Sequence, residues 1–188
     1  MLILGSSSPR RIELLKTLIS DFKILKPLFD ESTLSSPASD YALEEAKNKY
    51  ISLKNLANPN DFIICCDTVV ILDDEIFGKP KDYNEAFKML KRLSGKTHKV
   101  ISGYVIACDK QNILIEKSVT TEVTFNKLSD EEIKRYIEEE NVYDKAGSYA
   151  IQDDEKYHLV SKIKGSFYNV MGFPLEEIKL DLLSLKII

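Results

Sequence analysis

The most constraining feature of the sequence is the long apolar run FIICCDTVVIL at residues 62–72. Its enrichment in β-branched residues favours a strand over a helix. A strand that is apolar on both faces is typical of the interior of a sheet that helices cover on its two sides. The run therefore predicts an α/β fold in which residues 62–72 form a central, buried strand.

Shorter patterns predict the elements around this strand. Alternating apolar residues indicate further strands, and apolar residues at helical spacing next to capping residues indicate helices. We find no internal repeat, low-complexity tract or linker in the sequence, so we expect a mixed sheet in one continuous unit. The predicted strands are residues 2–4, 22–25, 99–108, 113–125 and the stretch around 149–151, and the predicted helices are residues 9–20, 40–56, 83–93, 129–140 and 175–185.

Length and charge narrow the classes of function. A chain of 188 residues fits one domain, or one domain folded as two lobes around a cleft. Its net charge of −4 argues against a protein that coats DNA or RNA, because such proteins usually carry a basic surplus. A nucleotide is therefore expected as a small ligand in a local basic pocket rather than as a polymer.

Targeting signals and cysteine usage point to one compartment. The sequence shows neither a secretory signal pattern nor an apolar run of the roughly 20 residues that span a bilayer. Cys65, Cys66 and Cys108 are odd in number, and two of them lie in the apolar run, so they do not indicate a disulfide framework. We expect reduced thiols in the core and a cytoplasmic protein with no membrane partner.

Within the apolar run, Asp67 is the most informative position. Burying a carboxylate without a partner is costly, so a sequence that places one there usually needs it. The functional interpretation is a general base or a metal ligand at the edge of a cleft, with the hydroxyl of Thr68 beside it. The structural alternative is an aspartate at a strand end that caps neighbouring backbone groups.

The N-terminal segment GSSSPRR at residues 5–11 suggests an anion site. Ser8 suits the N-cap of a helix, and Pro9 suits its first position. Backbone N–H groups at a helix start favour anions, and the guanidinium groups of Arg10 and Arg11 suit a phosphate. An ordinary turn would tolerate the same residues.

Four further polar residues are candidates for the same site. Lys79 in GKP has a constrained backbone and an ammonium suited to a phosphate, and Lys49 is predicted to lie on a helix. Glu31 in FDES is a candidate metal ligand, and Gln152 in YAIQ carries an amide of the kind that reads a nucleobase edge. Taken singly, each is explained equally well by a turn or a solvated face. Together with Asp67 they fit a triphosphate, whose hydrolysis requires charge neutralisation, an activated water and usually a divalent cation.

Eight sequence blocks follow one another over nearly the whole chain: SSSPRRIELL, FDES, AKNK, CDTVV, GKP, LSGKTHKVISGYVI, DKAGSYAIQ and IKGSFYNVMGFPL. In this order they resemble the Maf family of nucleoside triphosphate pyrophosphatases. The resemblance implies a single Maf-like domain over residues 1–188. It also implies an α/β fold with a twisted mixed β-sheet flanked by helices, and two lobes around a deep cleft.

The same resemblance implies a reaction. Family members hydrolyse a nucleoside triphosphate to the monophosphate and pyrophosphate with a divalent metal cation, Mg or Mn, and this implies a role in clearing non-standard nucleotides. The AGSYAIQ block is similar to the subfamily that acts on dTTP and UTP. Two alternatives stay open: a pyrophosphatase for 7-methyl-GTP or another modified nucleotide, and a non-catalytic, nucleotide-binding regulator of septum formation. Because family members are often dimers, a homodimer is implied.

Carried over position by position, the resemblance assigns roles to individual residues. Asp67 matches the proton acceptor and, with Glu31, is an expected metal ligand. The chain departs from the family after Gln152, where glycine is common and this sequence has Asp153. The positions matching base specificity are Arg10, Thr68 and Gln152, and the positions expected to bind phosphate are Ser8, Arg11, Lys49 and Lys79.

Overall fold

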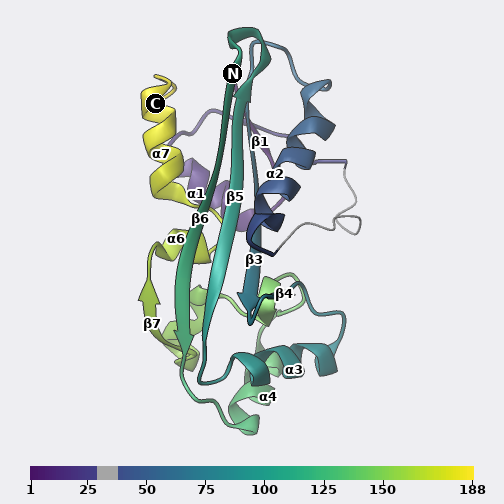
Figure 1. The fold of residues 1–188 in the computed structure, drawn as a ribbon, viewed down its shortest axis with the longest axis vertical. Helices are drawn as coiled ribbons and strands as arrows, with labels where there is room; N and C mark the ends of the chain where they lie inside the picture. Colours follow the sequence, from purple (N-terminus) through teal and green to yellow (C-terminus); the bar gives the residue numbers. More distant parts are fainter. Residues whose placement is uncertain (29–37) are drawn as a thin grey trace. The chain divides into compact units, whose positions relative to one another are not determined.

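The computed structural model of the protein describes residues 1–28 and 38–188 (Figure 1). In this part of the chain seven strands form one open, mixed sheet in the order β2-β1-β3-β5-β6-β7, with β4 paired to β3 beside this path. The predicted α/β fold with a mixed sheet is confirmed. The strands are β1 (Leu2–Gly5), β2 (Lys23–Ile24), β3 (Phe62–Leu72), β4 (Glu75–Phe77), β5 (Thr97–Cys108), β6 (Ile113–Phe125) and β7 (Val160–Lys164).

The central position of the apolar run is also confirmed. β3 lies between β1 and β5 and pairs in parallel with β1, which places Leu4 opposite Ile64 and Gly5 opposite Cys65. β2 pairs with β1 in parallel, whereas β4 pairs with β3 and β7 pairs with β6 in antiparallel orientation. Most residues of β3 are buried, as expected for a strand covered on both faces.

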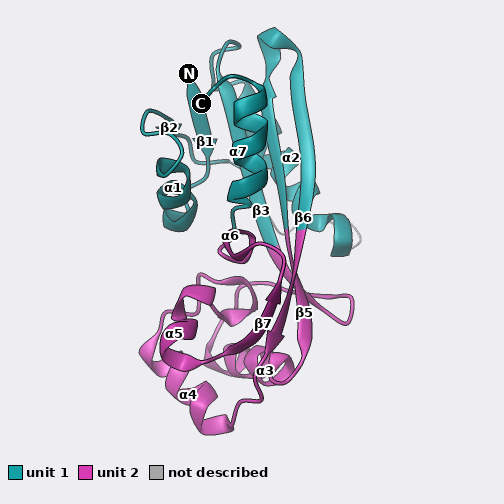
Figure 2. Cartoon of the chain, turned by 90° about the vertical axis from the view of Figure 1, so that its left-hand side faces the viewer, with its two compact units in different colours: residues 1–68, 102–119, 172–188 teal, residues 69–101, 120–171 magenta. Residues whose placement is uncertain are grey.

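The chain divides into two compact units, and strands β3, β5 and β6 contribute residues to both (Figure 2). Unit 1 contains residues 1–68, 102–119 and 172–188. Unit 2 contains residues 69–101 and 120–171. The single domain and the deep cleft that the resemblance implies stay predictions.

In unit 1, α2 (Ala38–Lys54) covers one face of the strands, and α1 (Pro9–Lys16) and α7 (Leu175–Ser184) lie on the other face (Figures 1 and 2). Strand residues alternate between the two faces. Leu53 of α2 packs against Ile63 and Cys65 of β3. On the opposite face, Tyr104 of β5 donates a hydrogen bond of 2.6 Å to Asp181 of α7.

Helix α2 approaches β5 closely at Gly103. A Cβ atom built on this glycine would lie 2.3 Å from the backbone of Leu43, closer than real Cβ atoms come to any neighbour. Ala46 of α2 packs against Val105 and Ala107 on the same face of β5. Glycine at position 103 thus lets α2 lie directly against the strand. This contact fixes the helix that carries the candidate site residue Lys49.

Unit 2 has its own apolar core. Leu90 of α3 and Ile133 of α4 join residues of β5 and β6 in one buried cluster. Helix α4 begins with the predicted capping box, in which Ser129 and Glu132 each bond to the other's backbone N–H. The helices of unit 2 are α3 (Tyr83–Leu93), α4 (Asp130–Glu139), α5 (Asp154–Tyr157) and α6 (Phe167–Val170).

The predicted strand around residues 149–151 is wrong. The chain there forms two short 3-10 turns, η3 (Ala146–Ser148) and η4 (Ile151–Asp153). Ser148 has a φ of 65°, which a strand cannot contain. Tyr149 and Ala150, between the two turns, have extended backbone but form no strand of the sheet, so the alternation in YAIQ reflects alternate burial of side chains on a short unpaired stretch. Helix α1 also ends earlier than predicted, at Lys16.

The structure bears on two expectations from the sequence, the absence of a membrane-spanning segment and the state of the cysteines. None of the helices in residues 1–28 and 38–188 has the length and apolar character needed to cross a bilayer. Cys65, Cys66 and Cys108 are free and buried, which confirms that they are reduced thiols of the interior.

Candidate active site

The carboxylate of Asp67 forms an ion pair with Lys49. Alternation along β3 places Asp67 on the same face as Ile63 and Cys65, which is the face that α2 covers. Lys49 projects from α2, and its Nζ lies 2.5 Å from Oδ1 of Asp67. The side chains are 8% exposed for Lys49 and 14% for Asp67, so the pair is largely shielded from water.

This pair explains how the apolar run accommodates a charge. A buried carboxylate is tolerated when it is paired and hydrogen-bonded, and the ammonium of Lys49 supplies both. The pair uses Oδ1, while Oδ2 has no hydrogen-bond partner in the described part of the chain. Asp67 is therefore an oriented carboxylate whose second oxygen is not engaged by Lys49. The structural alternative, an aspartate that caps backbone groups at a strand end, does not describe it, since Asp67 lies inside β3.

Thr68 lies on the opposite face of β3 from Asp67. Its Oγ1 is 2.8 Å from Oγ of Ser102, which is fully buried, and 3.2 Å from the carbonyl oxygen of Gly172. Arg11 donates to the same hydroxyl from Nη2 at 3.3 Å. The two adjacent candidates on β3 thus have separate surroundings, one an ion pair beneath α2 and the other a hydroxyl network beside α1.

Arg11 joins three segments that are far apart in the sequence. Its Nε donates to the carbonyl of Gly172 at 2.8 Å, and its Nη1 donates to the carbonyl of Cys66 at 2.6 Å. Together with the bond to Thr68, these contacts tie α1 to β3 and to the segment before α7. The planar, multi-donor guanidinium suits such a junction, which an ammonium cannot reproduce. The predicted phosphate-binding role of Arg11 stays a prediction.

The turn between β1 and α1 holds two further candidates. Ser8 is the N-cap residue of α1, but its side chain makes no capping bond, and its backbone N–H donates to Oγ of Ser6 at 3.2 Å. Pro9 is the first helical residue, as predicted. Arg10 is half-buried and follows on the first turn of α1. The predicted helix start is confirmed, while its use as an anion site stays a prediction.

The remaining described candidates belong to unit 2. Lys79 and Gln152 are both exposed, and neither has a hydrogen-bond or ion-pair partner within residues 1–28 and 38–188. The turn that carries Lys79 is held by a backbone bond of 3.0 Å from the N–H of Gly147 to the carbonyl of Gly78. Gly147 has a φ of 69° and packs against Val70, so the close approach of these turns depends on a glycine.

The positions of the acidic, histidine and cysteine side chains show which of them could bind a metal ion. Glu31, the predicted partner of Asp67 as a ligand, lies outside the described residues. Within residues 1–28 and 38–188 no group of three or more histidine, cysteine or acidic side chains could hold a metal ion. Asp67 contributes one carboxylate oxygen that is not engaged by Lys49. This fits a hard cation that is bound through one or two carboxylates and substrate phosphates rather than in a full protein cage.

The cysteines beside Asp67 do not take part in chemistry as thiolates. Burial raises the pKa of Cys65 to about 12, and burial also raises the pKa of Cys66. Both thiols therefore stay protonated near neutral pH, and a protonated thiol is neither a nucleophile nor a metal ligand. Asp67 is the one residue of β3 with a charged side chain, and its predicted role as the general base stays a prediction.

Sequence reasoning missed residues that contact individual candidates within each unit. Ser102 contacts Thr68, Gly172 contacts Arg11, and Tyr136 contacts both neighbouring segments of Gln152. None of the three carries a charge, and the sequence analysis assigned none of them a role. For Gly172 the usable signal in the sequence was the glycine of the segment MGFP. The structure explains this glycine, because the φ of 101° at this position favours a residue without a side chain. Ser102 had the weaker signal of a polar residue within the mostly buried strand β5.

Comparisons with known proteins identify the family of the chain. The family model described as "Maf-like protein" matches residues 1–184. A dTTP/UTP pyrophosphatase of Clostridium botulinum (strain Alaska E43 / Type E3) is 42% identical over 179 residues, which cover 94% of this chain and 95% of the relative. The dTTP/UTP pyrophosphatase of Clostridium beijerinckii has the same identity and coverage. That of Fusobacterium nucleatum is 42% identical over 175 residues, or 93% of this chain and 90% of the relative. Because both kinds of match span nearly the whole chain, the protein belongs to the Maf family.

Proposed function

We propose that this protein is a nucleoside triphosphate pyrophosphatase that hydrolyses dTTP and UTP to the nucleoside monophosphate and pyrophosphate. Its membership of the Maf family and the names of its relatives support this reaction. The observation that carries the chemistry is the buried ion pair of Lys49 and Asp67, which presents an oriented carboxylate with one oxygen available.

Asp67 acts as the general base in this proposal. It accepts a proton from a water molecule whose oxygen forms a bond to the α-phosphorus. The bond from the α-phosphorus to the bridging oxygen breaks, and pyrophosphate leaves with the electron pair. Such transfers depend mainly on positioning and electrostatic stabilisation. The strand and the ion pair supply the positioning of the base.

A divalent cation, Mg²⁺ or Mn²⁺, belongs to the proposal. When bound, such a cation neutralises phosphate charge and polarises the phosphoryl oxygens. Asp67 and Glu31 are the residues proposed to hold it. The available oxygen of Asp67 supports its share of this role.

Cationic and polar residues are proposed to bind the rest of the substrate. Lys79 is supported as a phosphate ligand by its exposed ammonium on a turn that the Gly78–Gly147 bond fixes. Gln152 is supported as a base-reading residue by its exposed amide, which has two donors and an acceptor. The other proposed phosphate ligands are Ser8, Arg11 and Lys49, and the other proposed specificity residues are Arg10 and Thr68.

The biological setting follows from the same proposal. The whole of residues 1–188 is proposed to act as one Maf-like domain on a free nucleotide in the cytoplasm, as a homodimer, with clearing of non-standard nucleotides as its role. The net charge of −4 favours a small nucleotide over a nucleic acid polymer.

The direct test is pyrophosphate release from a panel of nucleotides. The purified protein is assayed with dTTP, UTP, dCTP, dATP, dGTP and 7-methyl-GTP, each with Mg²⁺, with Mn²⁺ and with a chelator. We expect release from dTTP and UTP well above the other nucleotides, and loss of activity with the chelator. Highest activity on 7-methyl-GTP would overturn the substrate assignment, and binding without turnover of any nucleotide would overturn the enzymatic one.

A further inference from the structure

Tyr136 holds the chain on both sides of Gln152. This tyrosine lies on α4 and is fully buried. Its hydroxyl accepts a hydrogen bond of 3.1 Å from the backbone N–H of Ala150 and donates one of 2.6 Å to Oδ2 of Asp153. One hydroxyl thus contacts the residue two positions before Gln152 and the residue directly after it.

The chemistry of the hydroxyl matches this double contact. A phenol donates one hydrogen and accepts others. Burial, followed by the hydrogen bond to Asp153, raises the pKa of Tyr136, so the hydroxyl keeps its proton. Between the two contacts the chain forms the η4 turn, in which Ile151 is buried while Gln152 is exposed. The backbone of this turn is therefore anchored on both sides of an exposed amide.

We infer that Tyr136 and Asp153 are positioning residues that fix the direction in which Gln152 presents its amide to the nucleobase. This inference rests on the proposed function, in which Gln152 reads the base. An amide that must make defined hydrogen bonds gains selectivity when its backbone is already ordered, because less freedom is lost on binding. If the amide of Gln152 is no longer aligned, its hydrogen bonds to the correct base become weaker, while non-specific contacts to the phosphates stay unchanged.

The side chain of Asp153 supports the inference. A residue without a polar side chain at this position could not accept the hydrogen bond of Tyr136. In this chain a carboxylate occupies the position, and its Oδ2 takes the proton of the buried hydroxyl. Asp153 thus gives this protein a second anchor for the turn beside the backbone contact at Ala150.

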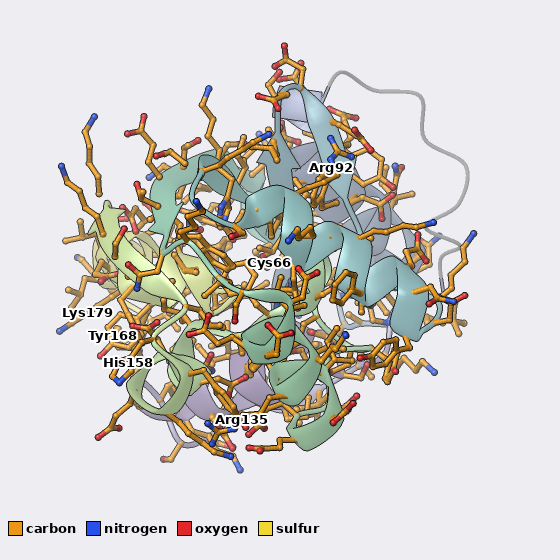
Figure 3. All side chains as sticks on the ribbon, turned by 90° about the horizontal axis from the view of Figure 1, so that it is seen from below. Cys66, Arg92, Arg135, His158, Tyr168 and Lys179 are labelled. Atoms are coloured by element: carbon orange, nitrogen blue, oxygen red, sulfur yellow. The ribbon has the colours of Figure 1, made fainter. Side chains whose placement is uncertain are left out.

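Tyr157 provides a matched control. Its ring meets that of Tyr136 edge to face, with centroids 4.9 Å apart. Its hydroxyl, however, donates to Glu139 and Glu140 at 2.8 Å. The guanidinium of Arg135, which is labelled near the bottom of Figure 3, lies over the ring of Tyr157 at 5.7 Å from its centroid. The change Tyr157→Phe therefore removes a hydroxyl from the same aromatic pair without touching the η4 turn.

The test measures kcat and KM for dTTP and dATP in the unmodified protein and in five single variants. For Tyr136→Phe we expect a higher KM for dTTP, a kcat within about threefold, and a fall of about tenfold in the preference for dTTP over dATP. Tyr157→Phe is expected to keep the preference. Asp153→Ala should lose it, whereas Asp153→Asn, which keeps an oxygen acceptor, should retain most of it. Gln152→Ala sets the scale of the full loss.

Each outcome decides the inference. If Tyr136→Phe and Asp153→Ala keep the preference while Gln152→Ala loses it, the anchoring role is wrong and the proposed function stands. If Gln152→Ala also keeps the preference, both the anchoring role and base reading by Gln152 are wrong. Absence of pyrophosphate release from dTTP by the unmodified protein would overturn the proposed function itself, and the inference with it. Should Tyr136→Phe fold poorly, the Asp153 pair gives the same decision from a half-exposed position.

Discussion

The Nζ of Lys49 lies 2.5 Å from Oδ1 of Asp67, and this contact joins the middle of α2 to the middle of the central strand. Neither residue is near the other in the sequence. Because both side chains are largely buried, each charge depends on the other for its solvation. The pair therefore links the stability of unit 1 to the orientation of the proposed base.

This dependence is testable by removing the ammonium. We expect Lys49→Met to lower the free energy of unfolding by about 2–4 kcal/mol, because it leaves the carboxylate buried without a partner. The double variant with Asp67→Asn should be more stable than the sum of the two single changes predicts. Lys47→Met, on the same helix but in more exposed pairs with Glu44 and Glu116, should cost less than about 1 kcal/mol. Urea unfolding that shows strict additivity would contradict the coupling.

The contacts of Arg11 predict a stability effect without substrate. Arg11→Lys should lower the unfolding free energy of the free protein by about 1–3 kcal/mol, because an ammonium cannot serve the carbonyls of Cys66 and Gly172 and the hydroxyl of Thr68 together. Lys79→Met removes an exposed cation and should change it by less than about 0.5 kcal/mol. Unchanged or increased stability of Arg11→Lys would mean that Arg11 serves substrate alone.

Burial of His98 predicts a pH dependence of stability. Burial lowers its pKa to about 4 from the ordinary 6.5, so the unfolded chain binds a proton more readily between these values. The free energy of unfolding should therefore fall as the pH drops from 6.5 to 4, by up to about 3 kcal/mol from this residue. Comparison of His98→Gln with the exposed control His158→Gln isolates the effect. Equal slopes in the two variants would contradict it.

The close approach of α2 to β5 predicts a strongly position-dependent effect of one methyl group. Gly103→Ala should destabilise the protein by about 3 kcal/mol, since its Cβ would overlap the backbone of Leu43. Gly78→Ala is the matched control, because no atom lies within 4 Å of a Cβ built there. Thermal unfolding of both variants measures the difference. Similar melting temperatures would show that α2 shifts to make room.

Elements with local signals were predictable from the sequence. The apolar run at residues 62–72 predicted β3 with the bounds that the structure shows, and the capping box at Ser129 predicted the start of α4. The turns η3 and η4 were not predictable, because they depend on contacts with distant residues. Ala150, for example, is held by Tyr136 from another element, and Gly147 by Gly78. Burial that alternates along YAIQ imitates the pattern of a strand.

In the candidate site, too, features with a local sequence signal were predictable, and features that depend on distant contacts were not. Asp67 was identifiable because a charge inside an apolar strand needs a reason. Its pairing with Lys49 follows only when α2 is placed against β3, whereas the separation of Thr68 onto the opposite face already follows from alternation along the strand. The role of Arg11 as a junction depends on Gly172, at the far end of the chain. Such contacts leave no pattern in neighbouring residues.

The most direct measurement of the central claim is the turnover of dTTP by Asp67→Asn. The amide keeps the shape of the side chain but cannot accept the proton from water, so kcat should fall by about 10²–10⁴-fold while KM changes little. Asp181→Asn is the matched control, because Asp181 is also a buried acid, paired with Lys117 at 2.5 Å, and has no proposed role in the reaction. A folded Asp67→Asn protein that turns over dTTP as fast as Asp181→Asn would contradict the account.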